Sequence, residues 1–306
     1  MIQEAGIRAA PERETATVAV VVVSFNVREL LRACLQSVLA AGGIRTELVV
    51  VDNASSDRSG DMVAAEFPGV RLIRNPDNRG FSRASNQGIS ATSAPYVLSL
   101  NPDAVVEPDA IVILADYLRD HPEAGAVGPK IVRPDGSLDL AARRSFPSPL
   151  VALPRLSLLS RIFPRNQRLA RYNLTDRSPD VVQEIDSGTA ACLMFRRDVL
   201  AQVGLYDEAF FMYGEDLDLC YRIKAAGWRI IYLPQAVVLH HKGQSSRLKS
   251  NDMIREFHRA MWIFFRKHYR RTTPGPVAAL IHAGIEARSA SLQLANALRR
   301  EKRVSR

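Results

Sequence analysis

The sequence has no run of about 20 consecutive apolar residues, the length that a helix needs to cross a bilayer. Residues 1–17 are mixed and charged and lack the apolar centre of a signal peptide. The three cysteines, Cys34, Cys192 and Cys220, lie far apart and without metal-ligand spacing. We therefore expect reduced, mostly buried thiols in a cytoplasmic protein, neither disulfide-stabilised nor integral to a membrane.

Acidic residues are scarce in two segments of the chain. Residues 140–175 contain seven arginines and no Asp or Glu, and residues 247–306 contain 14 Lys and Arg against 4 Asp and Glu. The net charge is only +9, so the rest of the chain is mildly acidic. Basic segments of this kind usually contact nucleic acid, phosphorylated substrates or lipid head groups. The basic tail lacks interleaved aromatic residues for stacking on bases, which argues against nucleic acid.

Apolar strand patterns alternate with amphipathic helix patterns in the first part of the chain. The predicted strands are residues 18–23, 47–51, 70–73 and 96–100, and the predicted helices are residues 27–40, 59–67 and 83–91. Continuous β-branched runs are typical of strands buried on both faces. The alternation predicts an α/β fold with a doubly wound mixed sheet flanked by helices.

The second half of the chain has a different pattern. Residues 185–195, 228–233 and 236–239 are predicted strands, and residues 214–226 are a predicted helix. Residues 252–269 carry aromatic and aliphatic side chains on one face, and an alanine-rich helix follows Pro276. The sequence thus predicts a C-terminal amphipathic helical extension.

Polar residues stand where the predicted strands end, which is where open α/β sheets bind their ligands. They are Ser24, Asn26, Asp52, Asn53, Asn101 and Asp103. The carboxylate of Asp52 suits a base N–H or a ribose hydroxyl. A single carboxylate such as Asp103 can bind Mg²⁺ or Mn²⁺ together with substrate phosphates. The alternative for Asp103 is a proline turn with a capping aspartate.

The turn-rich stretch before residue 81 contains Arg79 and Gly80. Backbone N–H groups before a helix, together with an arginine, can bind a diphosphate. On these residues alone an ordinary loop is an equal alternative.

Glu215, Asp216 and Asp218 place three carboxylates within four residues at the start of a predicted helix. The helix dipole favours acids there, which is the structural alternative. Aromatic residues at 210, 211 and 213 flank the cluster and favour a partly desolvated general base instead.

His240 and His241 follow an apolar strand. Adjacent side chains on a strand point in opposite directions, so at most one of the two should face a site at this edge. A metal or phosphate ligand and a structural histidine are equal alternatives at this point.

Seven ordered stretches together carry a family resemblance. They are VVVVSFN (20–26), VVDNASSD (50–57), NRGFSRASNQGI (78–89), LNPDA (100–104), DSGTAACLMFRR (186–197), YDEAFFMYGEDLDLCYR (206–222) and HHKGQSS (240–246). In this order they resemble the family-2 glycosyltransferases with the GT-A fold, in particular the bacterial rhamnosyltransferase-like branch that builds cell-surface polysaccharide. The resemblance covers residues 17–271.

The resemblance implies a role for individual residues. Asp52 would recognise the nucleotide base, Asp103 would ligate the divalent cation, and His240 would be a further metal or phosphate contact. Asp216 would deprotonate the acceptor hydroxyl, supported by Glu215 and Asp218. Asp186, Ser187 and Gly188 would shape the donor-sugar and acceptor side. Many members have an Asp where this chain has Asn101, which weakens the implied dependence on Mg²⁺ or Mn²⁺.

The resemblance also implies a reaction and a place for it. The enzyme would be an inverting hexosyltransferase that moves a sugar, with rhamnose as one candidate, from a nucleotide-diphosphate sugar. The acceptor would be a saccharide or a polyprenyl-diphosphate-linked sugar. The basic amphipathic stretches of residues 150–171 and 252–306 would dock at the inner face of an anionic cell membrane. A nucleotidyltransferase and a non-catalytic sugar-nucleotide-binding protein of the same fold remain the alternatives. A dehydrogenase is excluded because no G-x-G-x-x-G follows the first strand.

These expectations divide the chain into three parts. Residues 1–16 form a disordered or loosely ordered N-terminus, residues 17–246 a GT-A catalytic domain, and residues 247–306 a basic amphipathic helical extension. Within the catalytic domain, residues 17–104 form the nucleotide-binding half and residues 105–246 the acceptor half. The basic apolar insert of residues 140–175 belongs to the acceptor half.

Overall fold

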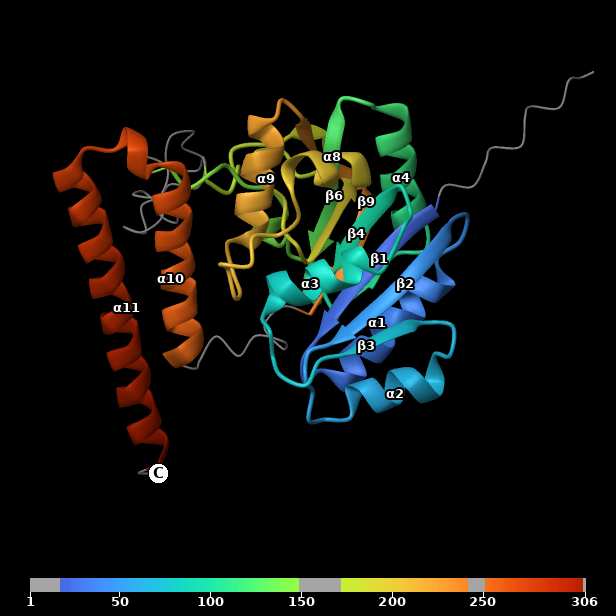
Figure 1. The fold of residues 1–306 in the computed structure, drawn as a ribbon, viewed down its shortest axis with the longest axis horizontal. Helices are drawn as coiled ribbons and strands as arrows, with labels where there is room; N and C mark the ends of the chain where they lie inside the picture. Colours follow the sequence, from blue (N-terminus) through green and yellow to red (C-terminus); the bar gives the residue numbers. More distant parts are fainter. Residues whose placement is uncertain (1–16, 149–171, 242–250, 305–306) are drawn as a thin grey trace, which may run out of the picture.

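The structure, a computed structural model, describes residues 17–148, 172–241 and 251–304 (Figure 1). Its centre is a nine-stranded mixed sheet in the order β3-β2-β1-β4-β8-β6-β9-β5, with β7 paired to β9. The strands are β1 (Thr17–Ser24), β2 (Arg45–Asp52), β3 (Arg71–Arg74), β4 (Tyr96–Leu100), β5 (Ala104–Val106), β6 (Ala124–Val132), β7 (Gln183–Glu184), β8 (Cys192–Arg196) and β9 (Arg229–His240). The predicted doubly wound mixed sheet is confirmed.

The first four strands along the sheet are parallel, with β1 paired to both β2 and β4, and β2 paired to β3. Strand β8 is antiparallel to β4 and β6, whereas β6 and β9 are parallel to each other. The parallel block therefore brings the carboxyl ends of β1, β2 and β4 to one edge, as the sequence predicts.

Helices cover both faces of the sheet (Figure 1). They are α1 (Arg28–Ala40), α2 (Ser59–Glu66), α3 (Phe81–Ser90), α4 (Ala110–Asp120), α8 (Arg197–Val203), α9 (Glu215–Ala225), α10 (Asn251–His268) and α11 (Gly275–Val304). Helix α1 buries Leu31, Cys34, Leu35 and Val38, the stripe that its periodicity predicts. Gly88 lets α3 approach the sheet, because a Cβ there would lie 2.4 Å from Cγ1 of Val21.

The strand predicted over residues 185–195 is wrong in its first half. Strand β8 begins at Cys192, and residues 186–189 leave the sheet. The reason is a tertiary partner: Ser187 forms an isolated antiparallel bridge with Arg144, with backbone hydrogen bonds of 2.9 and 3.0 Å. The backbone groups of Ser187 therefore bond to the distant Arg144 and do not extend strand β8.

The two strands predicted over residues 228–239 form one strand, β9. Its pairing with β6 shifts register between Leu233 and Val237. Pro234 stands in this gap and has no backbone N–H to donate, so the strand continues through an irregularity. Five elements, β5, α4, β6, β7 and α8, were not predicted from the sequence.

The C-terminal extension is a pair of helices, as predicted. Helix α10 packs on α9, and α11 packs on α10 at the outer side of the molecule (Figure 1). The rings of Trp262 and His282 stack at 4.1 Å between the two helices. Within the described ranges, no helix has the length and apolar character that crossing a membrane requires. The predictions for residues 1–16, for most of the basic insert and for residues 242–246 lie outside the described residues.

Candidate active site

The carboxyl ends of the parallel strands carry two of the predicted carboxylates. Asp52 ends β2, and Asp103 lies between β4 and β5. His240, at the end of β9, is brought to Asp103 because Ala104 and His240 are direct partners in the antiparallel pair β5–β9. The sheet register therefore unites two residues that are 137 positions apart.

His240 lies between two buried carboxylates. Its Nε2 is 3.1 Å from Oδ1 of Asp103, and its Nδ1 is 3.4 Å from Oδ2 of Asp139. Burial by itself would lower the pKa of His240, but its hydrogen bonds to Asp103 and Asp139 outweigh burial and raise the pKa to about 9. The imidazole is therefore protonated at neutral pH in this arrangement. Asp139 was missed by the sequence analysis, because no motif surrounds it.

Asp103 and His240 are the side chains that a divalent cation would contact here. Asp103 and His240 present two neighbouring ligand atoms, and the described residues contain no group of three or more His, Cys, Asp or Glu side chains arranged around one point. A cation would fit here only with further ligands from donor phosphates and with His240 in its neutral form. Asn101 stands where many family members have an Asp. Its backbone N–H donates to the carbonyl oxygen of Ala191, and its own carbonyl oxygen accepts from the N–H of Ala104.

Asp52, the last residue of β2, is nearly buried beside the first turn of α2. It accepts a hydrogen bond from the N–H of Ser55 at 3.2 Å. A Cβ on Gly60 would lie 2.6 Å from Oδ2 of Asp52, so glycine leaves space for this carboxylate. Ser24, at the end of β1, is fully buried. The exposed Asn26 accepts a hydrogen bond from the N–H of Ser56 at 2.7 Å. Asn26 thus fastens the loop after β2.

Asn53 holds the loop of residues 75–80 in place. Its Nδ2 donates to Oδ1 of Asn78 at 2.8 Å, and its Oδ1 accepts from the Nδ2 of Asn75 at 2.9 Å and from the N–H of Arg79 at 3.1 Å. Asn53 is one of the residues predicted to bind the nucleotide donor, and in the structure its amide is engaged with this loop. The side chain of Arg79 is half-exposed and pairs with Asp77.

Gly80 joins the two halves of the site. Its φ of 79° lies in the left-handed region, and a Cβ would stand 2.5 Å from the backbone oxygen of Phe211. The N–H of Phe81 donates to that same oxygen at 2.7 Å. The loop before α3 is therefore bonded to the loop before α9, which carries the acid cluster.

Asp216 is a buried carboxylate with a fixed cationic partner. Its Oδ2 accepts from Nη2 of Arg144 at 2.7 Å and from the N–H of Ala190 at 3.4 Å. Its Oδ1 accepts from the N–H of Leu217 at 2.7 Å. Burial would lower the pKa of the Arg144 guanidinium, but the Asp216 carboxylate raises it, so Arg144 stays charged.

Arg144 was not identified as a site residue from the sequence. It was counted only as one of the seven arginines of the basic insert. Its Nη2 also reaches Oγ of Ser187 at 3.4 Å and the carbonyl oxygen of Gly188, so it ties the predicted segment 186–188 to Asp216. Arg143 is buried too, donating to the carbonyls of Ser178 and Arg177 at 2.8 Å.

Glu215 differs from its neighbour Asp216. Burial, and next the charge of Asp216, raise the pKa of Glu215 to about 8, so this carboxyl holds its proton at neutral pH. Its Oε2 is buried without a hydrogen-bond partner among the described residues. A protonated Glu215 cannot accept a proton, which leaves Asp216 as the carboxylate suited to a general base.

Asp218 does not lie beside Asp216. Two residues along a helix are about 200° apart around its axis, so Asp218 faces away from Arg144 and toward α10. It is completely buried and accepts from His268 at 2.7 Å and from Arg222 at 2.9 Å. The resemblance also implied that Asp218 lies on the acceptor side with residues 186–188, whereas its carboxylate faces α10. Asp186, which is half-buried, accepts from the N–H of Phe146 at 3.1 Å.

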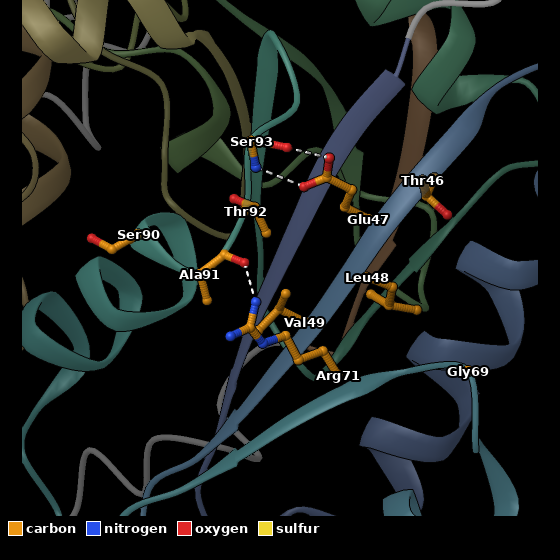
Figure 2. A pocket seen from close by; sticks show the side chains of 10 residues that line it. All are labelled: Thr46, Glu47, Leu48, Val49, Gly69, Arg71, Ser90, Ala91, Thr92 and Ser93. Atoms are coloured by element: carbon orange, nitrogen blue, oxygen red, sulfur yellow. Dashed lines mark hydrogen bonds between the residues drawn. The ribbon is translucent and has the colours of Figure 1, made fainter.

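The chain also has a shallow hollow of about 520 Å³ that lies away from these carboxylates (Figure 2). It is lined by residues 46–49 at the start of β2, by Gly69 and Arg71, and by residues 90–93. Two of its polar side chains are engaged within the hollow: Glu47 accepts from the N–H and Oγ of Ser93 at 2.7 and 3.0 Å, and Arg71 donates to the carbonyl oxygen of Ala91. Asp52 lies at the other end of β2, so this hollow is not the candidate active site.

Known proteins match this chain over most of its length. A profile of the family described as "Glycosyltransferase like family 2" matches residues 15–259. An N-acetylglucosaminyl-diphospho-decaprenol L-rhamnosyltransferase of Mycobacterium tuberculosis is 30% identical over 295 residues, covering 93% of this chain and 95% of that protein. The succinoglycan biosynthesis protein ExoO of Rhizobium meliloti is 31% identical over 255 residues, which cover 81% of this chain and 68% of its own length.

Solved structures show the same fold at low sequence identity. The mannosyltransferase PcManGT of Pyrobaculum calidifontis, in complex with GDP-Man and Mn²⁺, aligns with a TM-score of 0.58 and 18% identity, covering 96% of this chain and 77% of that one. GalNAc-T7 with UDP, GalNAc and Mn²⁺ aligns with a TM-score of 0.56 and 15% identity, covering 88% and 54%. The family match, the shared GT-A fold and the ordered carboxylates agree: this chain belongs to the family-2 glycosyltransferases.

Proposed function

We propose that this glycosyltransferase moves a sugar, with rhamnose as the first candidate, from a nucleotide-diphosphate sugar to a saccharide linked to polyprenyl diphosphate, with inversion. The buried Asp216 held by Arg144 at the start of α9 is the observation that carries the mechanism. The similarity to a decaprenol-linked rhamnosyltransferase over nearly the whole length of both chains supports the choice of substrates.

Asp216 is the general base in this proposal. An in-line attack needs a base on the side of the sugar opposite the leaving diphosphate, and Asp216 lies in the acceptor half of the chain. The guanidinium of Arg144 and the N–H of Ala190 fix one oxygen of its carboxylate. A carboxylate held in this way spends little free energy on reorientation before it accepts the proton of the acceptor hydroxyl.

The donor would bind across the strand ends. Asp52 would contact the base or ribose, while Arg79 and Asn101 would lie near the diphosphate, on loops that Ser24, Asn26 and Asn53 stabilise. Asp103 and His240 would hold Mg²⁺ or Mn²⁺. A bound cation neutralises negative charge on the leaving diphosphate. Loop 75–80 would thus define the donor side, and segment 186–188 the acceptor side.

The division of the chain follows these roles. Residues 17–104 carry Asp52, Arg79 and Asp103 and form the nucleotide-binding half. Residues 105–246 carry Arg144 and Asp216 and form the acceptor half. Residues 247–306 form the helical extension.

The enzyme would work at the cytoplasmic face of the membrane, where a polyprenyl carrier is embedded. Helix α11 carries exposed apolar side chains at Val277, Leu280, Leu294 and Leu298 on the side away from its buried Ala278 and Ile285. The sequence around it is strongly basic. An apolar helix face flanked by positive charge suits a surface of anionic lipid.

Replacement of the base tests the mechanism. We expect Asp216→Asn to lower kcat by about 10²- to 10⁴-fold, because the acceptor hydroxyl loses its proton acceptor. The affinity for the nucleotide sugar should stay within about twofold, since Asp216 lies outside the donor half. The assay uses UDP-, dTDP- and GDP-sugars with Mg²⁺ or Mn²⁺ and a polyprenyl-diphosphate-GlcNAc acceptor, and NMR of the product gives its anomeric configuration.

Asp116→Asn is the matched control. Asp116 is a half-exposed carboxylate on α4 that pairs with Arg119 of the same helix, and its variant should keep wild-type kcat. Full activity of Asp216→Asn would remove Asp216 from the mechanism. A product with retained anomeric configuration would contradict inversion.

A further inference from the structure

The helix that carries Asp216 is held from two sides. Arg144 contacts Asp216 on one side, and the C-terminal helix α10 contacts Asp218 on the other. The two carboxylates are separated by a single residue of α9. Any movement of Asp218 therefore moves the start of α9, and Asp216 with it.

Asp218 is a fully buried carboxylate that three basic side chains contact. Arg222 of its own helix lies at 2.9 Å, and His268 and Lys267 of α10 lie at 2.7 and 2.8 Å. Burial would raise the pKa of Asp218, but the hydrogen bonds from His268 and Lys267, and then the charge of Arg222, lower it to about 2. The carboxylate is therefore ionised at neutral pH, and its partners come largely from the C-terminal extension.

Helix α10 also contacts the loop that leads into α9. Nζ of Lys267 lies 2.5 Å from Oδ2 of Asp207, where the loop begins. Phe210, in the middle of the loop, is buried against Ala260 and Phe264 of α10. The ring of Tyr213, just before the helix start, meets that of Phe257 at 5.6 Å. The contacts run from the beginning of the loop to the first turn of the catalytic helix.

We propose that α10 is a positioning element of the active site, in which His268 and Lys267 hold Asp218 and thereby fix Asp216 against Arg144. This inference rests on the proposed role of Asp216 as the base. The C-terminal extension then has a part in sugar transfer that is separate from any contact with a membrane. His268 is a positioning residue, because it touches neither substrate nor the base itself.

The effect on catalysis follows from geometry. A displacement of about 1 Å at a catalytic group can lower the rate by about 100-fold. His268 is nearly buried and its ring also lies 4.0 Å from that of Tyr221, so water cannot take its place without rearrangement. Loss of its hydrogen bond to Asp218 should therefore loosen the start of α9.

The test compares His268→Ala with His268→Gln in the full-length enzyme. We expect His268→Ala to lower kcat by about 10- to 100-fold, with the affinity for the nucleotide sugar within about twofold of wild type. His268→Gln keeps an N–H donor at a similar reach and should recover most of the lost activity. Hydrogen exchange of residues 207–218 should be faster in the alanine variant than in wild type.

Arg259→Ala is the control on the same helix. Arg259 is exposed and pairs with Glu256 of α10, so its variant should match wild type in kcat and in exchange. Unchanged exchange and activity in His268→Ala would overturn the proposal. Equal losses of kcat and donor affinity would also overturn it, since they indicate general unfolding. If the wild-type enzyme transfers no sugar, the proposed function fails, while the exchange comparison still decides whether His268 holds the loop.

Discussion

At the scale of single residues, two neighbouring carboxyl groups at the start of α9 have different surroundings. Asp216 accepts a hydrogen bond from Arg144, whereas burial, and next the charge of Asp216, raise the pKa of Glu215 to about 8. The environment of each side chain, and not its type, decides which of the two can accept a proton. The start of α9 thus carries two acids with different roles.

The pair Arg144–Asp216 should contribute to stability as well as to catalysis. We expect Arg144→Ala to lower the free energy of unfolding by about 3–5 kcal/mol, because it leaves a buried carboxylate without its cation. The double variant Arg144→Ala/Asp216→Asn should lose less than the sum of the two single losses. Urea denaturation measures all three values.

Arg119→Ala is the comparison at the surface. Arg119 pairs with Asp116 and Asp120 in the open, and its loss should cost less than about 1 kcal/mol. Equal costs for Arg144→Ala and Arg119→Ala, or strict additivity in the double variant, would contradict a coupled buried pair.

At the scale of elements, short backbone contacts between loops align the two halves of the site. The loop before α3 and the loop before α9 meet at Gly80 and Phe211, 131 positions apart in the sequence. The donor-side loop is itself fastened by Asn53. This contact adds to the hydrogen bonds of Asn86 with the backbone of Tyr206, which also join α3 to the loop before α9.

Substitutions at two glycines distinguish the effect of the contact between Gly80 and Phe211 from the effect of backbone strain. Gly80 and Gly136 have nearly the same positive φ, 79° and 78°, but only Gly80 faces a backbone atom, at 2.5 Å from a Cβ position. Gly136→Ala should cost about 1–2 kcal/mol for the left-handed conformation alone. Gly80→Ala should cost about 3 kcal/mol or more and weaken nucleotide binding, because the loop must move away from Phe211.

Thermal unfolding and nucleotide-binding titrations of both variants make this comparison. Equal losses of stability in the two variants would show that the contact between the loops is unimportant. Intact nucleotide affinity in Gly80→Ala would separate this loop from donor binding.

At the scale of the whole molecule, the C-terminal extension has an inner and an outer helix. Helix α10 packs on α9, while α11 lies outside α10 (Figure 1). Helix α11 has exposed apolar side chains such as Leu280 and Leu294. The inner helix would position the site, and the outer one would meet the membrane that holds the acceptor. The charge pattern of residues 247–306 does not distinguish positioning of the site from contact with a membrane. In this proposal α10 has the first role and α11 has the second.

The membrane contact predicts a selective loss of lipid binding. The double variant Leu280→Gln/Leu294→Gln should bind vesicles of anionic phosphatidylglycerol about tenfold more weakly than wild type, because two exposed leucines lose apolar contact. Its transfer to a water-soluble acceptor analogue should be unchanged. Vesicle sedimentation at low and high salt measures the binding, which salt should weaken.

Leu39→Gln is the control, since Leu39 is as exposed as these leucines but lies on α1. Equal vesicle binding by the wild type and the double variant would exclude α11 as the contact. A concentration-dependent dimer of the wild type that the double variant loses would assign this face to a second copy of the chain.

The sequence by itself determined most of the strands, most helices and the order of the motifs. Apolar runs such as residues 18–23 and the acid cluster at 215–218 are signals within a few residues, and local periodicity is enough to place them on a strand or at a helix start. The ends of parallel strands share an edge, so the sequence also placed Asp52 and Asp103 on one side of the sheet.

Only the tertiary structure decided which groups face each other. Arg144 meets Asp216 across 72 positions, and His240 comes between Asp103 and Asp139 through strand pairing. Asp218 turns from the site to α10 because of its angle around the helix. These outcomes depend on chain closure over long distances, and no pattern within a short window of sequence encodes them.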